Sequence, residues 1–126
     1  MRIGIACILC LLLAAPAMAA DGEGKAALEF VKNLRRMVDG GQRDAIAKLV
    51  DYPLLLDGEP VIEDAAAFVR KYDSILTARV RDCVSGHDME TPMEEIKAAY
   101  MVGNGCIWFE SDGEGNMAIV AVNTKE

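Results

Sequence analysis

The first hydrophobic pattern with a helical period spans Lys25–Val38. Its apolar residues recur at steps of three and four, which places them on one face of an amphipathic helix: Leu28, Val31, Leu34 and Val38. The glycine at Gly40 favours a helix end, because glycine accepts the left-handed conformation that follows many helices. A second, shorter helix is predicted over Gln42–Val50, and it must end before Pro53 because proline disfavours helix in the preceding residue.

Residues 52–62 read YPLLLDGEPVI and predict a β-hairpin. The pair Asp57-Gly58 is favoured in the two-residue type I′ turn that joins two antiparallel strands. Pro53 and Pro60 each lack a backbone donor, so both are expected at the start or the open edge of a sheet. The apolar side chains of this hairpin need a cover, and helical patterns stand on both sides of it in the sequence.

A further helical pattern follows Asp64, a residue type that often caps a helix N-terminus. Its apolar residues share one face: Phe68, Tyr72, Ile75 and Leu76. A short helix is expected to restart at Thr77, with Val80, Cys83 and Val84 on one side. Residues 85–92 read SGHDMETP, which is a polar stretch with glycine and proline and predicts a loop.

The last third of the chain predicts a three-stranded meander over Ala98–Val102, Cys106–Glu110 and Met117–Val122. Asn104-Gly105 is a second type I′ pair, and Asp112–Asn116 predicts a third turn, not an EF-hand calcium loop, whose acidic spacing it lacks. The order of helices, hairpin, helices and meander is typical of an α+β domain, with the helices packed on one face of an antiparallel sheet.

The N-terminus has the order of a secretory signal peptide over residues 1–19: one cation, an apolar run from Ile3 to Ala15, and Ala17-Met18-Ala19. The run is too short to span a bilayer as a helix. Cleavage after Ala19 would leave a single domain over residues 20–126 in the periplasm or outside the cell. A retained membrane anchor and a lipoprotein modified at Cys10 are the two alternatives.

The formal net charge is −7, with 20 acidic and 13 basic residues. Arg2 is the only charged residue in the predicted signal, so the remaining chain would carry −8. Nucleic acid and anionic membrane surfaces are poor partners for such a chain, which is also predicted to leave the membrane once the signal is cleaved.

Export would leave two cysteines, Cys83 and Cys106, in a compartment that permits disulfides. A disulfide between them is favoured, and two free buried thiols are the alternative. Two cysteines with the single histidine, His87, do not supply the four ligands of a structural zinc site. No metal and no cofactor are predicted.

The stretches YPL…DGE…VIEDAAAFVRKYDSIL, MVGNGCIWF and AIVAVN, with the element order, resemble small exported bacterial members of the nuclear transport factor 2-like superfamily. The resemblance covers roughly residues 27–123. It implies a curved antiparallel sheet wrapped around a long helix, forming a cone with an apolar cavity. The residues expected to line that cone and bind a ligand are Tyr52, Leu54, Phe68, Tyr72, Tyr100 and Trp108.

Trp108 is the only tryptophan, and alternation along a strand sets it opposite to Ile107 and Phe109. Cys106 and Glu110 would then share its side. An inward Trp108 joins the cone lining, whereas an outward Trp108 forms a contact surface for a partner. Glu110 slightly favours the outward orientation, because an unpaired buried carboxylate is costly.

Enzymes of this superfamily use a carboxylate or histidine base, so the candidate groups are Tyr52, Tyr72, Asp73, His87 and Tyr100. None can be paired with a partner from spacing alone, and no catalytic residue is assigned. The favoured function is an exported, non-catalytic binding or accessory module for a small apolar ligand or a protein partner, which includes a second copy docked through the sheet face. The alternative is a cofactor-free isomerase, dehydratase or hydrolase that uses tyrosine or aspartate groups in the cone.

Overall fold

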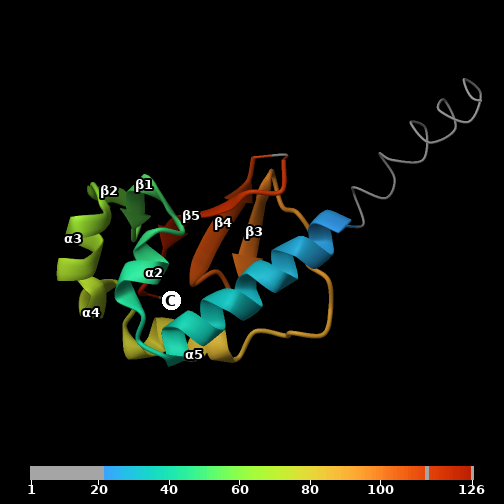
Figure 1. Ribbon diagram of the computed structural model, residues 1–126, viewed down its shortest axis with the longest axis horizontal. Coiled ribbons are helices and arrows are strands. Elements are labelled where there is room, and N and C mark those ends of the chain that lie inside the picture. Colours follow the sequence, from blue (N-terminus) through green and yellow to red (C-terminus); the bar gives the residue numbers. More distant parts are fainter. Residues whose placement is uncertain (1–21, 113, 126) are drawn as a thin grey trace, which may run out of the picture.

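The computed structural model describes residues 22–112 and 114–125 (Figure 1). The predicted signal peptide, residues 1–19, lies outside the described residues. A long helix occupies residues 22–39. It is followed by α2 (Arg43–Ala47), β1 (Val50–Leu56), β2 (Glu59–Ile62), α3 (Ala65–Arg70), α4 (Tyr72–Ile75), α5 (Ala78–Ser85), β3 (Ala99–Val102), β4 (Ile107–Ser111) and β5 (Met117–Val122). The α+β class predicted from the sequence is confirmed.

The five strands form one open sheet in the order β2-β1-β5-β4-β3. The meander β3-β4-β5 and the hairpin β1-β2 are antiparallel, as predicted. The expectation of a wholly antiparallel sheet is wrong, because the hairpin joins the meander through β1, which runs parallel to β5. Parallel neighbours need a long crossover connection, and α3, α4, α5, β3 and β4 all lie in that connection.

The long helix lies against the face of the sheet that carries Phe109 (Figure 1). The ring of Phe30, from this helix, is 4.6 Å from the ring of Phe109 on β4, which in turn is 5.3 Å from the ring of Tyr100 on β3. The apolar helical face predicted from the sequence is confirmed, since its four residues are all buried: Leu28, Val31, Leu34 and Val38. The core of the domain therefore lies between this helix and one face of the sheet.

The hairpin turn at Asp57-Gly58 is confirmed, with φ values of 52° and 89° that fit a type I′ turn. Pro60 lies on β2, an edge strand, as expected. Pro53 does not, because β1 has neighbours on both sides. Pro53 is tolerated there because the pairing of β1 with β5 is irregular between Val50 and Leu55. At such an irregularity the strand does not need a backbone N–H from the proline to pair with its neighbour.

Two helix predictions need correction. The predicted helix Gln42–Val50 is only Arg43–Ala47, because Val50 already pairs with Ile119 of β5. The predicted continuous helix after Asp64 is divided into α3 and α4 at Lys71. The cap predicted at Asp64 is confirmed, since its side chain accepts from the Ala67 N–H at 2.8 Å. The helix start predicted at Thr77 is confirmed as well, and the Thr77 hydroxyl accepts from the Val80 N–H at 3.3 Å.

The predicted type I′ turn at Asn104-Gly105 is wrong. Residues 103–106 form a longer turn in which Gly103 and Gly105 have positive φ, at 55° and 105°. Gly103 lies against the disulfide that joins Cys83 of α5 to Cys106, and a Cβ at Gly103 would stand 2.6 Å from the Cys83 Sγ. The turn is therefore shaped by its contact with α5, which local sequence does not reveal.

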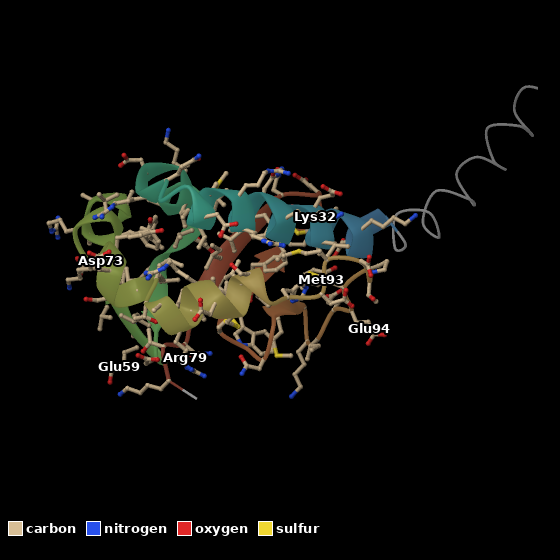
Figure 2. The ribbon with its side chains drawn as sticks, turned by 90° about the horizontal axis from the view of Figure 1, so that it is seen from below. Lys32, Glu59, Asp73, Arg79, Met93 and Glu94 are labelled. Carbon is tan, nitrogen blue, oxygen red and sulfur yellow. A yellow bond between two sulfur atoms is a disulfide. The ribbon has the colours of Figure 1, made fainter. Side chains whose placement is uncertain are left out.

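The disulfide between Cys83 and Cys106 is confirmed, with a Cα–Cα distance of 6.5 Å and a sequence separation of 23. It ties α5 to the start of β4. The loop that leads from α5 to β3 crosses to the other end of the long helix, where the Met93 N–H donates to the Gly24 carbonyl at 3.2 Å (Figure 2). Within residues 22–112 and 114–125, none of the helices has the length and apolar character needed to cross a membrane.

Candidate functional site

The six residues predicted to line a cone do not come together around one cavity. Four of them are buried in the core: Leu54, Phe68, Tyr72 and Tyr100. Tyr52 is half-buried against the core, and its hydroxyl donates to the Ala47 carbonyl at 2.7 Å. Trp108 lies apart from these five, on the side of β4 opposite to the buried Ile107 and Phe109.

The buried tyrosine hydroxyls differ in their partners. The Tyr100 hydroxyl donates to the Glu23 carboxylate at 2.8 Å, and burial together with this bond raises the pKa of Tyr100. Burial also raises the pKa of Tyr72, whose hydroxyl is buried without a hydrogen-bond partner in the described residues. The Arg43 guanidinium stands 5.0 Å from the centre of the Tyr72 ring. A raised pKa opposes ionisation, so neither hydroxyl is prepared to act as a base near neutral pH.

This difference between the two hydroxyls can be tested with matched substitutions. We expect Tyr72→Phe to leave stability unchanged or to raise it by about 1 kcal/mol, because it removes a buried polar group that has no partner. We expect Tyr100→Phe to lower stability by about 1–2 kcal/mol, because the Glu23 carboxylate loses its donor. Urea unfolding of both variants decides the matter. An equal loss of stability in both would show that the Tyr72 hydroxyl has a partner.

The two remaining catalytic candidates have structural partners. Asp73 is exposed and lies 4.0 Å from Arg43 in an ion pair. His87 is half-buried in the loop after α5, and its Nδ1 accepts from the Gly103 N–H at 2.9 Å. Burial lowers the pKa of His87. The histidine therefore holds the turn beside the disulfide in its neutral form, and no second candidate group is paired with it.

His87 predicts how stability depends on pH. Its folded pKa lies below the unfolded value of about 6.5. The unfolded chain therefore binds the proton first, and the contribution of neutral His87 is complete above pH 6.5 and is lost as the pH falls toward the folded pKa. We expect the unfolding free energy to fall as the pH drops below about 6.5 and to level off below the folded pKa of His87. His87 is the only histidine, so His87→Asn should flatten this range, and an unchanged slope in the variant would contradict the assignment.

An apolar row crosses the sheet on the face opposite to Phe109. The strand register aligns Met101 of β3 with Trp108 of β4, Trp108 with Ala121 of β5, and Ala121 with Leu55 of β1. Leu55 is 37% exposed, and Val61 on the neighbouring strand β2 is 44% exposed.

Of the two orientations left open by the sequence, Trp108 has the outward one. Glu110 shares its side and is exposed, as expected. Cys106 precedes the strand and is buried in the disulfide.

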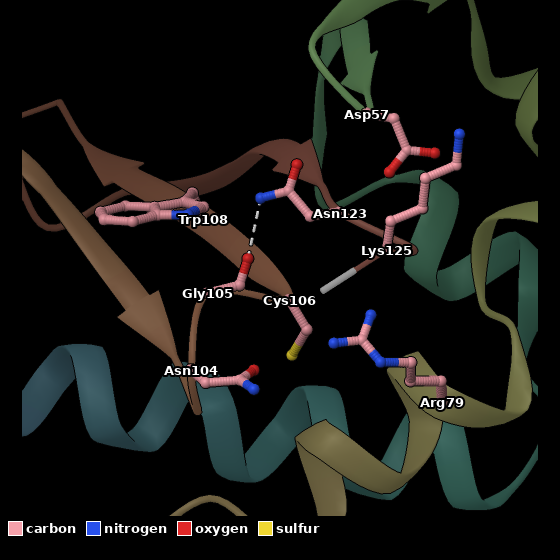
Figure 3. Close-up of a pocket in the computed structure, with 8 residues that line it drawn as sticks. All are labelled: Asp57, Arg79, Asn104, Gly105, Cys106, Trp108, Asn123 and Lys125. Carbon is pink, nitrogen blue, oxygen red and sulfur yellow. Dashed lines mark hydrogen bonds between the residues drawn. The ribbon is translucent and has the colours of Figure 1, made fainter.

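A hollow of about 600 Å³ opens beside Trp108 at one end of this face (Figure 3). Its walls come from the β1–β2 turn, α5, the β3–β4 turn, β4 and the segment after β5. The lining residues are Asp57, Arg79, Asn104, Gly105, Cys106, Trp108, Asn123 and Lys125. The hollow thus combines one indole with amide, carboxylate and cationic side chains.

The segment after β5 is fixed along one wall of the hollow by hydrogen bonds from three directions. The Asn123 N–H donates to the Cys106 carbonyl at 2.8 Å, and its side-chain Nδ2 donates to the Gly105 carbonyl at 2.9 Å. The Thr124 N–H and hydroxyl both donate to the Asp57 carboxylate at 2.7 Å. The Arg79 Nη1 donates to the Thr124 carbonyl at 2.9 Å. These bonds preorganise the hollow around the end of β5.

Sequence reasoning did not find this hollow. Of its lining, only Trp108 was a predicted site residue, and Cys106 was predicted for the disulfide. The feature of the sequence that could have indicated the hollow is the pair of glycine turns at Asp57-Gly58 and Asn104-Gly105, which the structure places at the same end of the sheet. That coincidence depends on β1 lying parallel to β5, and no local pattern predicts it.

The opposite end of the same sheet face is acidic. Asp51, Glu110 and Asp112 line a smaller hollow there. The Asp112 carboxylate accepts from the Glu114 N–H at 2.7 Å and from the Asn116 side chain at 2.9 Å, so it closes a turn, as predicted. In the part of the chain that the structure describes, no group of three or more histidine, cysteine, aspartate or glutamate residues could hold a metal ion.

The chain matches no protein-family model, no curated protein and no solved structure.

Proposed function

We propose that this chain is an exported, non-catalytic binding module that contacts its partner through the outer face of the sheet around Trp108. The observation that carries the proposal is the row Met101, Trp108, Ala121 and Leu55, aligned across four strands on the face that the long helix does not cover. Apolar side chains gathered on an uncovered surface are typical of interaction sites. Tryptophan is also among the residues that contribute most to binding energy at interfaces.

Export is supported by two separate features. Residues 1–19 have the pattern of a secretory signal peptide. The disulfide between Cys83 and Cys106 fits an oxidising compartment such as the periplasm or the extracellular space. We further propose membership of the nuclear transport factor 2-like superfamily, which the order of the long helix, hairpin, helices and meander supports. A cone-like curvature of its open sheet is part of that proposal.

The partner is proposed to be a protein, with a second copy of this chain as one case. The acidic hollow at one end of the face and Lys125 at the other would oppose each other in a two-fold dimer. A small apolar ligand inside a cone is less well supported, because Leu54, Phe68, Tyr72 and Tyr100 are packed in the core.

The alternative function, a cofactor-free isomerase, dehydratase or hydrolase, draws its support from Tyr72. Its hydroxyl is the buried side-chain polar group that has no hydrogen-bond partner in the described residues. Against this, Tyr72 is nearly inaccessible to solvent, at 4% exposure, and its raised pKa makes it a poor base. The binding function therefore has the stronger support.

Site-specific photocrosslinking in the native cell envelope tests the proposal. A benzophenone amino acid is introduced at Trp108, and the matched control carries it at Lys48, an exposed residue at the end of α2. We expect a discrete covalent adduct from position 108 and none from position 48. Equal adducts at both positions, or no adduct at 108, would contradict a binding role for this face.

A further inference from the structure

We propose that the outer face of the sheet receives an extended segment of a second protein, whose arginine side chain lies on the Trp108 indole and pairs with the Glu110 carboxylate. The inference rests on the proposed function and specifies the chemistry of the partner that the Trp108 face recognises. The arginine of this segment is flanked by apolar residues, which contact the apolar side chains on either side of Trp108.

The outer face is apolar across the whole width of the sheet. Among the residues that the structure describes, the exposed large apolar side chains are Leu55, Val61 and Ile96. The first belongs to the apolar row. Val61 precedes Ile62, which is buried on the other face, so Val61 points outward. Ile96 pairs with Ala99, which in turn pairs with Glu110, so Ile96 also lies on the outer side.

The width of this apolar surface fits a polypeptide segment. From Val61 on β2 to Ile96 beside β3 it crosses five strand spacings of about 4.8 Å each, which gives a width of about 24 Å. An extended segment of about seven residues has this length. Side chains of such a segment alternate, so every second one reaches the face of the sheet.

Two carboxylates at one end of this face have no partner among the described residues. Glu110 is exposed and stands between two alanines in the strand register, Ala99 on β3 and Ala118 on β5. Asp51 is also exposed and lines the small acidic hollow together with Glu110. Neither carboxylate forms an ion pair with a residue that the structure describes. The charge of this end is therefore complementary to a cation of the partner.

Trp108 supplies the second contact for that cation. It lies two residues before Glu110 in β4, so both side chains emerge on the same face, with Cα atoms about 7 Å apart. A guanidinium within about 6 Å of an indole ring is attracted to its face. Because the guanidinium is planar, it can lie on the ring and donate to a carboxylate from its edge, which an ammonium cannot do. Figure 3 shows Arg79 and Lys125 across the larger hollow from the indole, so neither takes this place.

The charge of the whole chain favours a different protein over a second copy. The net charge is −7, so two copies repel each other, whereas a segment that carries arginine is attracted to the acidic end. Arginine and tryptophan are also among the residues most enriched where binding energy concentrates at interfaces.

The test follows the single indole N–H signal of Trp108 in ¹H–¹⁵N NMR spectra of the purified mature protein. The probe is the peptide acetyl-Gly-Leu-Gly-Arg-Gly-Leu-Gly-amide, in which both leucines and the arginine point to one side. We expect a saturable shift that weakens with added salt. The same peptide with citrulline, which is neutral and similar in shape, should bind at least fivefold more weakly, because it loses both the ion pair and the attraction to the indole. Lysine in place of arginine should give an intermediate affinity.

Two further comparisons separate the charge from the apolar surface. Replacing both leucines of the peptide with glycine should weaken binding at least fivefold, because the apolar contacts are lost. Glu110→Gln should weaken binding of the arginine peptide two- to fivefold and leave the citrulline peptide unchanged. The matched control is Asp44→Asn, which makes the same change in net charge at an exposed residue of α2, and it should change neither affinity.

The contrary outcomes are equally specific. Equal binding of the arginine and citrulline peptides, an unchanged affinity in Glu110→Gln, or no saturable shift with any peptide would overturn the inference. So would a dimer of the protein alone that sedimentation detects and Glu110→Gln dissociates, because a second copy would then occupy the face. Purified protein and synthetic peptides are used, so such a failure leaves the crosslinking result from position 108 standing, and the reverse also holds.

Discussion

Phe109→Ala is expected to lower the free energy of unfolding by about 3–5 kcal/mol, which is the usual cost of truncating a fully buried phenylalanine. Phe109 has no exposed surface, and its ring contacts those of Phe30 on the long helix and Tyr100 on β3. The truncation would therefore leave a cavity between the helix and the sheet. A domain of this size has a total stability of about 5–15 kcal/mol, so the variant should be close to unfolding.

The neighbouring residue in the same strand supplies the control. Trp108→Ala should cost less than about 1.5 kcal/mol, because Trp108 is half-buried on the other side of β4 and packs against neither ring. Urea unfolding of both variants gives the comparison directly. A larger loss from Trp108→Ala than from Phe109→Ala would mean that the two faces of the sheet are assigned the wrong way round.

Removal of the disulfide in the double variant Cys83→Ala/Cys106→Ala is expected to lower stability by about 3 kcal/mol. The bond closes a loop with a sequence separation of 23, and in the chain-entropy model a loop of this length contributes about that amount. The bond also holds α5 against the turn at Gly103, so the hollow beside Trp108 should lose its fixed wall in the variant.

Chemical reduction of the unchanged protein is the control for this variant. Reduction should lower the unfolding free energy by a similar amount, and intact mass should rise by two hydrogens. Two free thiols in the oxidised protein, or a stability that does not respond to reduction, would contradict the bond. Gly103→Ala should also lower the unfolding free energy, because a Cβ at this position would stand 2.6 Å from the Cys83 Sγ.

The elements that local sequence determines were predicted well. The spacing of Leu28, Val31 and Leu34 predicts the long helix, because the apolar residues of an amphipathic helix repeat every three to four residues whatever surface the helix packs on. The hairpin was recognised by Asp57-Gly58, since few residue pairs accept positive φ at both positions. The disulfide followed from cysteine count and the predicted compartment, and not from a predicted distance.

The features that the sequence did not predict depend on contacts between distant segments. The place of β1 beside β5, and with it the position of Pro53 within the sheet, is decided by packing between segments about 70 residues apart. The turn at Asn104-Gly105 has a different form because α5 and its Cys83 approach Gly103. The hollow combines Asp57, Arg79 and Asn123 for the same reason. Four residues of the expected cone lining are instead buried in the core: Leu54, Phe68, Tyr72 and Tyr100.

Acrylamide quenching of the fluorescence of Trp108 shows whether its indole lies on the uncovered face of the sheet. Trp108 is the only tryptophan, so the signal reports the environment of this side chain alone. An indole on the uncovered face of the sheet should emit at longer wavelength than a core indole and should be quenched readily by acrylamide. A blue-shifted emission that resists acrylamide would place Trp108 in the core and would contradict a binding surface on this face.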